Sequence, residues 1–299
     1  MSAATTATKV RAPRPTAPSR RPWYRKAGAK KRIITTIVLI PICLIWIYPF
    51  LWMLSASVKP NGKVFAGLGL IPTKWYFDNY TAAWTDAHMG RYFINTITIT
   101  VAAVAIVLIT TSTMGYVLGR FSFPGKRIVI GILAALVFLP QGYTIIPIFD
   151  LVTKLHLTGN LFGIILAESG AAHIIQVLLF AGYFRQLPNE LEESAKVDGA
   201  GFLRTFLQIF LPLSRPVIAT TIILQVIASW NDFLIPLVLT SSQPNLRTLA
   251  VGIYSFQGNN FTQYSHMAAA SAISLLPVII IFLVLQRHFI EGLAGAVKQ

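Results

Sequence analysis

The sequence predicts an all-α membrane protein with six transmembrane helices and both termini on the cytoplasmic side. Of its 299 residues, 55% are hydrophobic and 12% are charged, and the mean hydropathy is +0.64. That composition is far from the average of soluble globular domains. Six apolar runs have the length of a membrane span, and basic residues are concentrated before the first run. A multi-pass protein of a bilayer follows from these observations.

The six predicted spans follow from the thickness of a bilayer core, about 30 Å, which a helix crosses with roughly 20 apolar residues. They form a predicted transmembrane domain over residues 33–290. The runs are Ile33–Val58, Tyr92–Gly119, Ile128–Phe149, Leu161–Phe184, Phe206–Leu239 and Met267–Leu285. The fourth run is interrupted by Glu168, for which we favour a place at the outer membrane interface.

The first 32 residues contain ten Lys or Arg residues and no acid. Such a cluster beside the first span is typical of a cytoplasmic segment, and its Ala, Thr and Pro content predicts a disordered tail over residues 1–32. Because much of the net charge of +15 lies there, we interpret it as a topology signal and expect no nucleic-acid partner. The first span is too long for a cleaved signal peptide and is read as a retained anchor.

The short loops alternate in charge as six spans require. Arg120, Lys126 and Arg127 lie between the second and third runs without an acid, whereas only Asp150 and Lys154 lie between the third and fourth. The first of these loops is therefore predicted to be cytoplasmic.

The loop over residues 188–205, between the fourth and fifth runs, is the most informative part of the chain. Asn189 is a predicted N-cap for a helix that begins with Glu190, and acids in its first turn suit the helix dipole. Gly199 permits a turn, after which an apolar helical pattern resumes through Phe202 and Phe206. Two short helices joined at a corner are expected.

Glu193-Ser194-Ala195, Asp198-Gly199-Ala200, Leu211-Pro212-Leu213 and Pro216 resemble the EAA loop of permeases from ABC importers. The usual second residue is Ala, and Ser194 replaces it with a side chain of similar size. The resemblance implies a coupling helix that docks in a groove of a separate ATPase. It assigns the coupling to the ATPase to Glu193, Ala195, Asp198, Gly199, Ala200, Phe202 and Phe206. An amphipathic helix at the membrane interface is the alternative.

ATP chemistry is predicted to lie in another chain. Gly62-Lys63 and Gly125-Lys126 are followed by Val64 and Arg127, and neither pair has the Ser or Thr and the spaced glycine of a P-loop. We expect no catalytic residue, no metal site and no cofactor here, with ATP and Mg²⁺ bound by the ATPase.

Two further motifs resemble carbohydrate permeases related to the maltose importer. Gln286-Arg287, Gly292-Leu293 and Gly295-Ala296-Val297-Lys298 resemble the closing pattern of that family, and Trp230-Asn231-Asp232-Phe233 resembles a motif in its fifth span. The resemblance implies that the tail, residues 291–299, contacts the ATPase through Gly295, Val297 and Lys298. A frayed terminus explains the tail equally well.

Polar residues inside the apolar runs are candidates for a substrate pathway. They are Tyr143, His173, Gln176, Trp230, Asn231 and Asp232. Polar groups at membrane depth usually face a bundle interior or water, and an indole can stack on a sugar ring. The alternative for Trp230, Asn231 and Asp232 is that they lock the fifth span against a neighbouring helix or lie near the outer membrane interface.

We therefore expect a sugar permease of the bacterial or archaeal cytoplasmic membrane that works by alternating access. The implied partners are a second homologous permease, two ABC ATPase subunits, an external solute-binding protein, membrane lipid and the sugar. A permease for a polyol or glycerol phosphate, or a secondary transporter that does not use ATP, are the alternatives.

Overall fold

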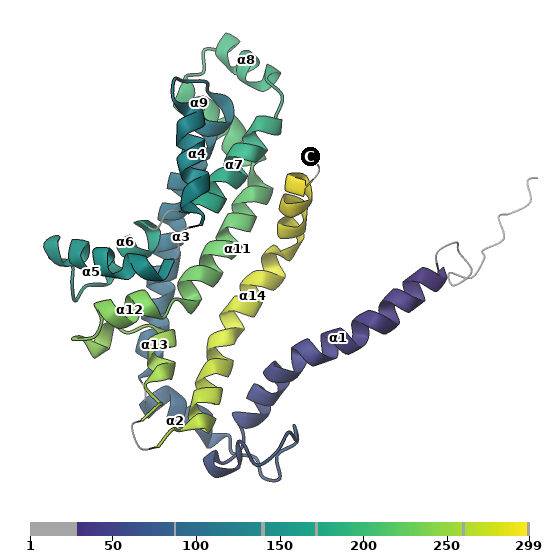
Figure 1. Cartoon of the computed structure of the whole chain (residues 1–299), viewed down its shortest axis with the longest axis vertical. Coiled ribbons are helices and arrows are strands. Elements are labelled where there is room, and N and C mark those ends of the chain that lie inside the picture. The colour runs from purple at the N-terminus through teal and green to yellow at the C-terminus, as the bar shows by residue number, and fades with distance from the viewer. Residues whose placement is uncertain (1–28, 87, 139–140, 171–172, 259–260, 298–299) are drawn as a thin grey trace, which may run out of the picture. The chain divides into compact units, whose positions relative to one another are not determined.

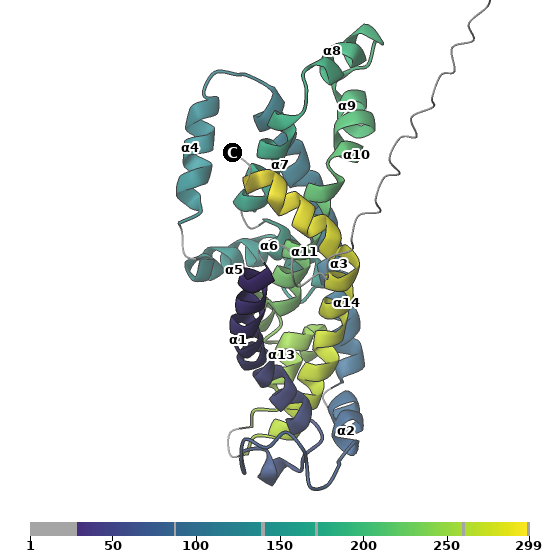
Figure 2. The ribbon, with the colours of Figure 1, turned by 90° about the vertical axis from the view of Figure 1, so that its right-hand side faces the viewer.

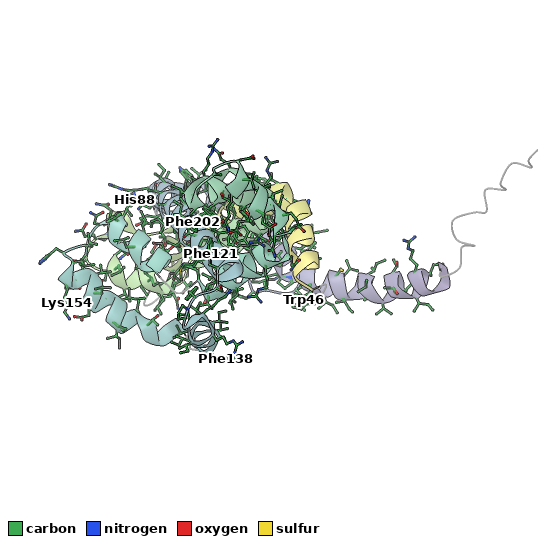
Figure 3. The ribbon with its side chains drawn as sticks, turned by 90° about the horizontal axis from the view of Figure 1, so that it is seen from above. Trp46, His88, Phe121, Phe138, Lys154 and Phe202 are labelled. Atoms are coloured by element: carbon green, nitrogen blue, oxygen red, sulfur yellow. The ribbon has the colours of Figure 1, made fainter. Side chains whose placement is uncertain are left out.

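The structure is a computed structural model that describes residues 29–86, 88–138, 141–170, 173–258 and 261–297. It divides into two units, Met1–Leu51 and Trp52–Gln299. In the first unit the described residues all belong to α1 (Ala29–Ala56), and apolar side chains such as Trp46 are exposed along it (Figure 3). The disordered tail was predicted over residues 1–32. Of these, residues 1–28 lie outside the described residues, and residues 29–32 belong to α1.

The described part of the second unit is helical, apart from turns and one isolated bridge between Gln257 and Thr262 (Figure 1). After the end of α1 its helices are η2 (Asn61–Lys63), α2 (Asp78–Asp86), α3 (Met89–Arg120), α4 (Lys126–Leu136), η3 (Gln141–Thr144), α5 (Ile145–Lys154), α6 (Leu161–Gly170), α7 (Ile174–Gln186), α8 (Glu190–Val197), α9 (Phe202–Thr205), the π-helix η4 (Phe206–Phe210), α10 (Leu211–Leu213), α11 (Arg215–Asn231), α12 (Leu234–Leu239), η5 (Pro244–Leu246), α13 (Leu249–Tyr254) and α14 (Tyr264–Val297).

Three helical segments among the described residues are long and apolar enough to cross a membrane: Arg32–Ala56, Met89–Arg120 and Tyr264–Gln286. Two bent pairs also qualify if each pair is one span, α6 with α7 at 54°, and the segment Phe202–Leu213 with α11 at 78°. The described residues therefore contain three to five candidate spans, and the count of six stays a prediction.

The predicted third span, residues 128–149, is not one helix. It is divided into α4, the 3₁₀ turn η3 and α5, and neither α4 nor α5 reaches the length of a span by itself. Gly142 lies in the turn, and Pro147 lies in the first turn of α5, where its missing N–H needs no partner. The predicted span is thus divided in the region that contains Gly142 and Pro147.

The predicted fifth span also starts later than expected. Its first residues, from Phe206, form η4 and α10, and the chain bends by 78° before α11 begins at Arg215. Pro216 occupies the first turn of α11, where proline is tolerated. The apolar run continues across the bend, so hydropathy alone does not reveal it.

Helices α3 and α7 are packed with their backbones close together. A Cβ added at Gly115 would overlap the Cβ of Phe180, and one added at Gly119 would lie 2.9 Å from the carbonyl oxygen of Ala181. Two glycines four residues apart are a known means of close helix approach in membranes. The pair α3 and α7 therefore forms a tightly packed unit.

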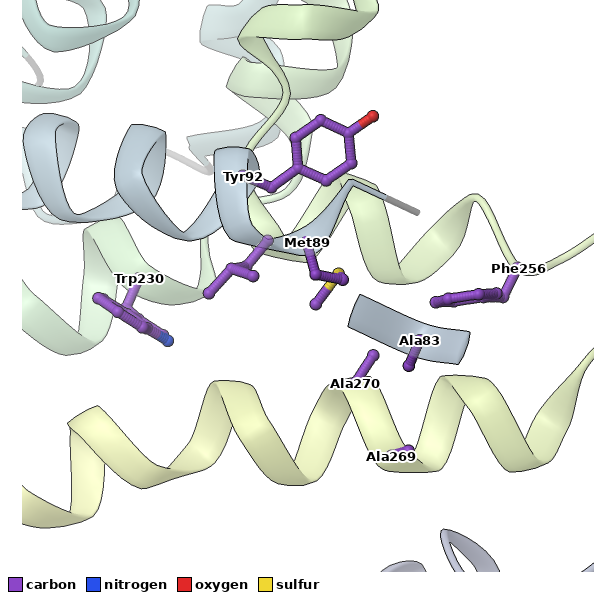
Figure 4. Packing of buried hydrophobic residues seen from close by; sticks show 8 residues of the cluster. Ala83, Met89, Tyr92, Trp230, Phe256, Ala269 and Ala270 are labelled. Atoms are coloured by element: carbon purple, nitrogen blue, oxygen red, sulfur yellow. The ribbon is translucent and has the colours of Figure 1, made fainter. Parts of the chain in front are cut away.

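Two apolar clusters lie at different places along the second unit. One contains Tyr116, Phe180, Phe184, Phe206, Phe210 and Val217. The other contains Ala83, Met89, Tyr92, Trp230, Leu249, Phe256, Ala269 and Ala270 (Figure 4). Helix α8 lies at one end of the unit, beyond α7 and α9 (Figures 1 and 2). The cluster around Tyr116 lies between α3, α7 and η4 and supports the base of the loop that carries α8.

Candidate functional site

Helix α8 occupies the loop that the sequence singled out, and three acids lie in its first turn. The predicted cap by the Asn189 side chain is wrong. Asn189 has φ −70° and ψ −27° and makes no capping hydrogen bond with its side chain, because a capping side chain needs an extended backbone at that position. Its carbonyl oxygen instead accepts hydrogen bonds from the amides of Glu192 and Glu193, at 2.9 and 3.1 Å.

The end of α8 is a Schellman turn. The amide of Ala200 donates to the carbonyl oxygen of Ala195 at 2.8 Å, and the amide of Gly199 donates to that of Lys196 at 3.1 Å. Gly199 has φ +73°, a conformation that glycine adopts without a steric penalty. This confirms the predicted turn at Gly199 and explains why glycine suits the position.

One face of α8 and its turn is exposed, and we call it the α8 surface: Glu193, Ser194, Val197, Asp198 and Gly199. Val197 is 87% exposed, and a Cβ at Gly199 would meet no atom within 4 Å. Acidic, apolar and small residues therefore form a continuous accessible strip. Ala200 is partly buried.

Three other residues assigned to the coupling lie closer to the core. Ala195 is 3% exposed and Phe206 is 4% exposed, so both side chains pack beneath the loop and not on its exposed surface. Phe202 is half-exposed, and its ring centroid lies 5.3 Å from those of Tyr116 and Phe121.

Sequence reasoning missed the role of Arg120, which it used only as a topology charge. Its Nε and Nη2 both lie 3.3 Å from Oε2 of Glu192. Its Nη1 donates to the carbonyl oxygens of Leu187 and Phe184, at 2.9 and 3.5 Å. The available signal was a cation directly after Gly119, at the end of a long apolar run.

Trp230 is part of the core rather than of an open pathway. Its side chain belongs to the buried cluster of Figure 4, and the residue is 4% exposed. The indole Nε1 donates to the carbonyl oxygen of Ser274 at 2.9 Å, and its ring meets that of Phe93 edge to face at 5.9 Å. Stacking on a sugar is therefore excluded in this conformation, and the helix-locking alternative is the one observed.

Asn231 and Asp232 stabilise the junction between α11 and α12. Nδ2 of Asn231 donates to the carbonyl oxygen of Ile227 at 2.8 Å. Oδ1 of Asp232 accepts hydrogen bonds from the amides of Leu234 and Ile235, at 3.1 and 3.4 Å. Asn231 is exposed and Asp232 is partly buried.

His173 and Gln176 lie where the fourth predicted span is broken. Nε2 of His173 donates to the carbonyl oxygen of Glu168 at 3.0 Å and so links α7 to the end of α6. Gln176 is partly buried in the first turn of α7. Tyr143 lies in η3, and its side chain is outside the described part of the structure.

Glu168 is buried, at 5% exposure, and lies near Ser229 of α11 and Asp232, which follows α11. Within the described residues, neither carboxyl oxygen has a hydrogen-bond partner, and the same is true of Oε1 of Gln225. Nε2 of Gln225 donates to Oγ of Ser229 at 3.0 Å. These side chains form a buried polar group between α6 and α11.

The proposed tail contact falls at the edge of the described residues. Gly295 and Val297 belong to α14, which continues to Val297 without a break at residue 291. Lys298 lies outside the described residues. The boundary that the sequence placed at 291 is therefore not a break in secondary structure.

Residues 112–294 match the family described as the inner membrane component of binding-protein-dependent transport systems. The chain belongs to this family. It is 33% identical over 267 residues to the diacetylchitobiose uptake system permease protein NgcG of Streptomyces coelicolor, with 89% of this chain and 87% of that protein covered. It is 32% identical over 269 residues to the melibiose/raffinose/stachyose import permease protein MelC of Bacillus subtilis, with 89% and 96% covered.

A solved structure with the same fold is a bacterial ABC transporter that imports the acidic polysaccharide alginate. One of its chains matches with a TM-score of 0.74 and 25% identity, and 90% of this chain and 100% of that chain are covered. The family consists of transport permeases rather than enzymes, and the protein is accordingly a multi-pass permease component of an ABC importer.

Proposed function

We propose that this permease imports an oligosaccharide by alternating access, and that separate ATPase subunits drive it through the α8 surface. The observation that carries the proposal is the exposed strip of Glu193, Val197, Asp198 and Gly199 on a short helix closed by a Schellman turn. A short rigid helix with an exposed face is suited to docking in a groove. The relatives named above are permeases for diacetylchitobiose and for melibiose, raffinose and stachyose, which favours an oligosaccharide.

Helix α8 is connected in sequence to α7 on one side and, through short segments, to α11 on the other. It follows α7 directly, and after its turn the chain passes through α9, η4 and α10 into α11. When ATP binding closes two ATPase subunits, α8 moves with them and displaces both neighbouring segments. The transmembrane helices then change from one access state to the other, and hydrolysis returns them.

The full transporter in this proposal contains this permease, a second homologous permease, two ATPases and an external solute-binding protein. ATP and Mg²⁺ are held by the ATPases, and this chain carries out no covalent chemistry. Asn231 and Asp232 remain candidates for solute contact because their side chains are accessible, and His173 and Gln176 lie at a helix break, where a membrane protein commonly lines a cavity.

Docking is tested with two substitutions at one residue. Gly199→Ala and Gly199→Arg both impose a side chain at φ +73° and carry the same backbone strain, roughly 1–2 kcal/mol. Only Arg adds bulk and positive charge to the α8 surface. When a tagged permease is purified from its host, we expect the ATPase to co-purify with wild type and Gly199→Ala, and to be lost with Gly199→Arg. Equal co-purification with both variants would contradict docking at this surface.

Transport is tested with radiolabelled solutes in membrane vesicles that contain the whole transporter. We expect ATP-dependent uptake of diacetylchitobiose or melibiose, and no uptake of glycerol phosphate. Uptake by the permease chain alone, in liposomes without an ATPase, would identify a secondary transporter instead.

A further inference from the structure

Arg120 carries a buried charge at the point where four helical segments meet. Its side chain is 4% exposed, and that of its partner Glu192 is 14% exposed. A charge so far removed from water is retained only if it is paired and hydrogen-bonded, and removing one partner leaves the other uncompensated. The pair is thus a specific feature of the fold, unlike an exposed ion pair that contributes little.

The guanidinium also binds the end of α7. Its Nη1 reaches the carbonyl oxygens of Phe184 and Leu187, at 3.5 and 2.9 Å. The last carbonyls of a helix lack partners within the helix and carry partial negative charge, so a cation is favoured there. One side chain of α3 therefore holds both the end of α7 and the start of α8.

Arg120 also contacts a fourth element, the π-helix η4. The Cζ atom of Arg120 lies 5.1 Å from the ring centroid of Phe210 in η4, within the range of a cation–π interaction. Phe210 is fully buried and packs on Tyr116 at 5.0 Å. The segment that leaves α8 towards α11 thus meets the same guanidinium.

The acids of α8 are divided between two faces. Glu192 turns inward to Arg120, while its neighbour Glu193 is exposed on the α8 surface. Lys196 also pairs with Glu192, at 3.1 Å, but its side chain is 68% exposed. Water screens that second pair, so Arg120 is the partner that orients Glu192.

We propose that Arg120 is a positioning residue that fixes α8 to the closely packed pair α3 and α7, so that the three helices move as one body when α8 is displaced. Without this contact, the ion pair between α8 and α3 is lost, and α8 can tilt about the connection that contains Leu187 and Asn189 before it moves its neighbours. The inference rests on the proposed function only in naming an ATPase as the agent that displaces α8.

The test measures a distance inside the tagged transporter, purified with its partners from its host. Cys43, the free cysteine among the described residues, is replaced by Ser, and spin labels are placed at Arg91→Cys on α3 and at Lys196→Cys in the last turn of α8, where the side chain is exposed. The two labels are separated by most of the length of α3, about 40 Å at 1.5 Å per residue. Double electron–electron resonance is recorded without nucleotide and after trapping with ATP and vanadate.

We expect one narrow distance distribution in both states for the wild-type pair. In Arg120→Gln and in Glu192→Gln the distribution broadens, and its maximum shifts on trapping. Because both substitutions remove the same ion pair, its loss is counted only once, and the double variant should broaden the distribution no more than Arg120→Gln alone. Amide protection of α8 in hydrogen exchange falls by roughly tenfold in all three. Arg185→Gln, which removes an exposed cation from the last turn of α7, is the matched control and leaves both readouts unchanged.

The outcomes separate this inference from the proposed function. Failure of the ATPase to co-purify with the wild-type permease contradicts the proposed function. Co-purification together with a narrow, unshifted distribution in Glu192→Gln contradicts the positioning role alone. Glu192→Gln keeps the side-chain volume, so it serves as the decisive variant if Arg120→Gln does not fold.

Discussion

Nε1 of Trp230 in α11 lies 2.9 Å from the carbonyl oxygen of Ser274 in α14, and this hydrogen bond joins two residues that are 44 positions apart in sequence. It lies beside the buried cluster that also holds Met89 and Tyr92. A tryptophan in such a place fills volume and supplies one directed contact. Its substitution therefore tests packing rather than solute recognition.

Trp230→Phe should lower the free energy of unfolding by about 1–2 kcal/mol, because it removes the hydrogen bond and part of the buried ring. Thermal unfolding in detergent measures this change. Ser274→Ala is the control: it leaves the backbone acceptor in place and should cost less. A loss of sugar affinity in Trp230→Phe at unchanged stability would contradict the packing role and indicate that Trp230 contacts the substrate.

Gly115→Ala should destabilise the protein by about 1–3 kcal/mol, since the new methyl group would overlap Phe180 and lie 3.0 Å from the amide nitrogen of Ala181. Gly182→Ala, on α7, is the matched control. A Cβ at Gly182 would meet no atom within 4 Å, and Ala is the better helix former by about 0.5–1 kcal/mol. The two variants should therefore shift the unfolding temperature in opposite directions, and a common direction would be inconsistent with the close approach of α3 and α7.

Phe206→Ala should cost about 3–5 kcal/mol, because the ring is buried among Tyr116 and its neighbours. Phe202→Ala should cost less, since Phe202 is 51% exposed. Chemical denaturation of the purified chain gives both values. If Phe206→Ala abolished ATPase binding while stability was unchanged, Phe206 would belong to the contact surface after all.

Glu168→Gln should change stability by less than about 1 kcal/mol, because both carboxyl oxygens lack hydrogen-bond partners among the described residues and the amide has the same shape. Glu168→Ala should cost more, since it leaves a cavity beside Ser229. The measurement is again the unfolding temperature in detergent. A large loss in Glu168→Gln would mean that the carboxylate has a charged partner in the assembled transporter.

The sequence predicted best where a local pattern determines a local structure. The helix beginning at Glu190 and the turn at Gly199 follow from acids, apolar spacing and one glycine. The apolar runs that became α1, α3 and α14 were recognised because hydropathy alone marks them. Family membership followed from the same loop motif.

Other features depend on contacts between distant residues. Hydropathy does not distinguish Phe206, which is buried before a bend, from the residues of α11 that follow it. From the sequence, Trp230 was compatible with a substrate pathway or with helix packing, and only the hydrogen bond from its indole to Ser274 decided between them. The pairing of Arg120 with Glu192 brings together residues 72 positions apart, and no short motif records it.

That separation has a consequence for the order of synthesis. Because translation runs from the N-terminus, the ribosome makes Arg120 first, then the α7 carbonyls that its guanidinium binds, and Glu192 only 72 residues later. Until then the guanidinium has no counter-ion from α8, and burying it would be costly. The end of α3 that carries Arg120 is therefore completed only after the nascent chain has emerged past α8, so α3, synthesised early, acquires its final packing late.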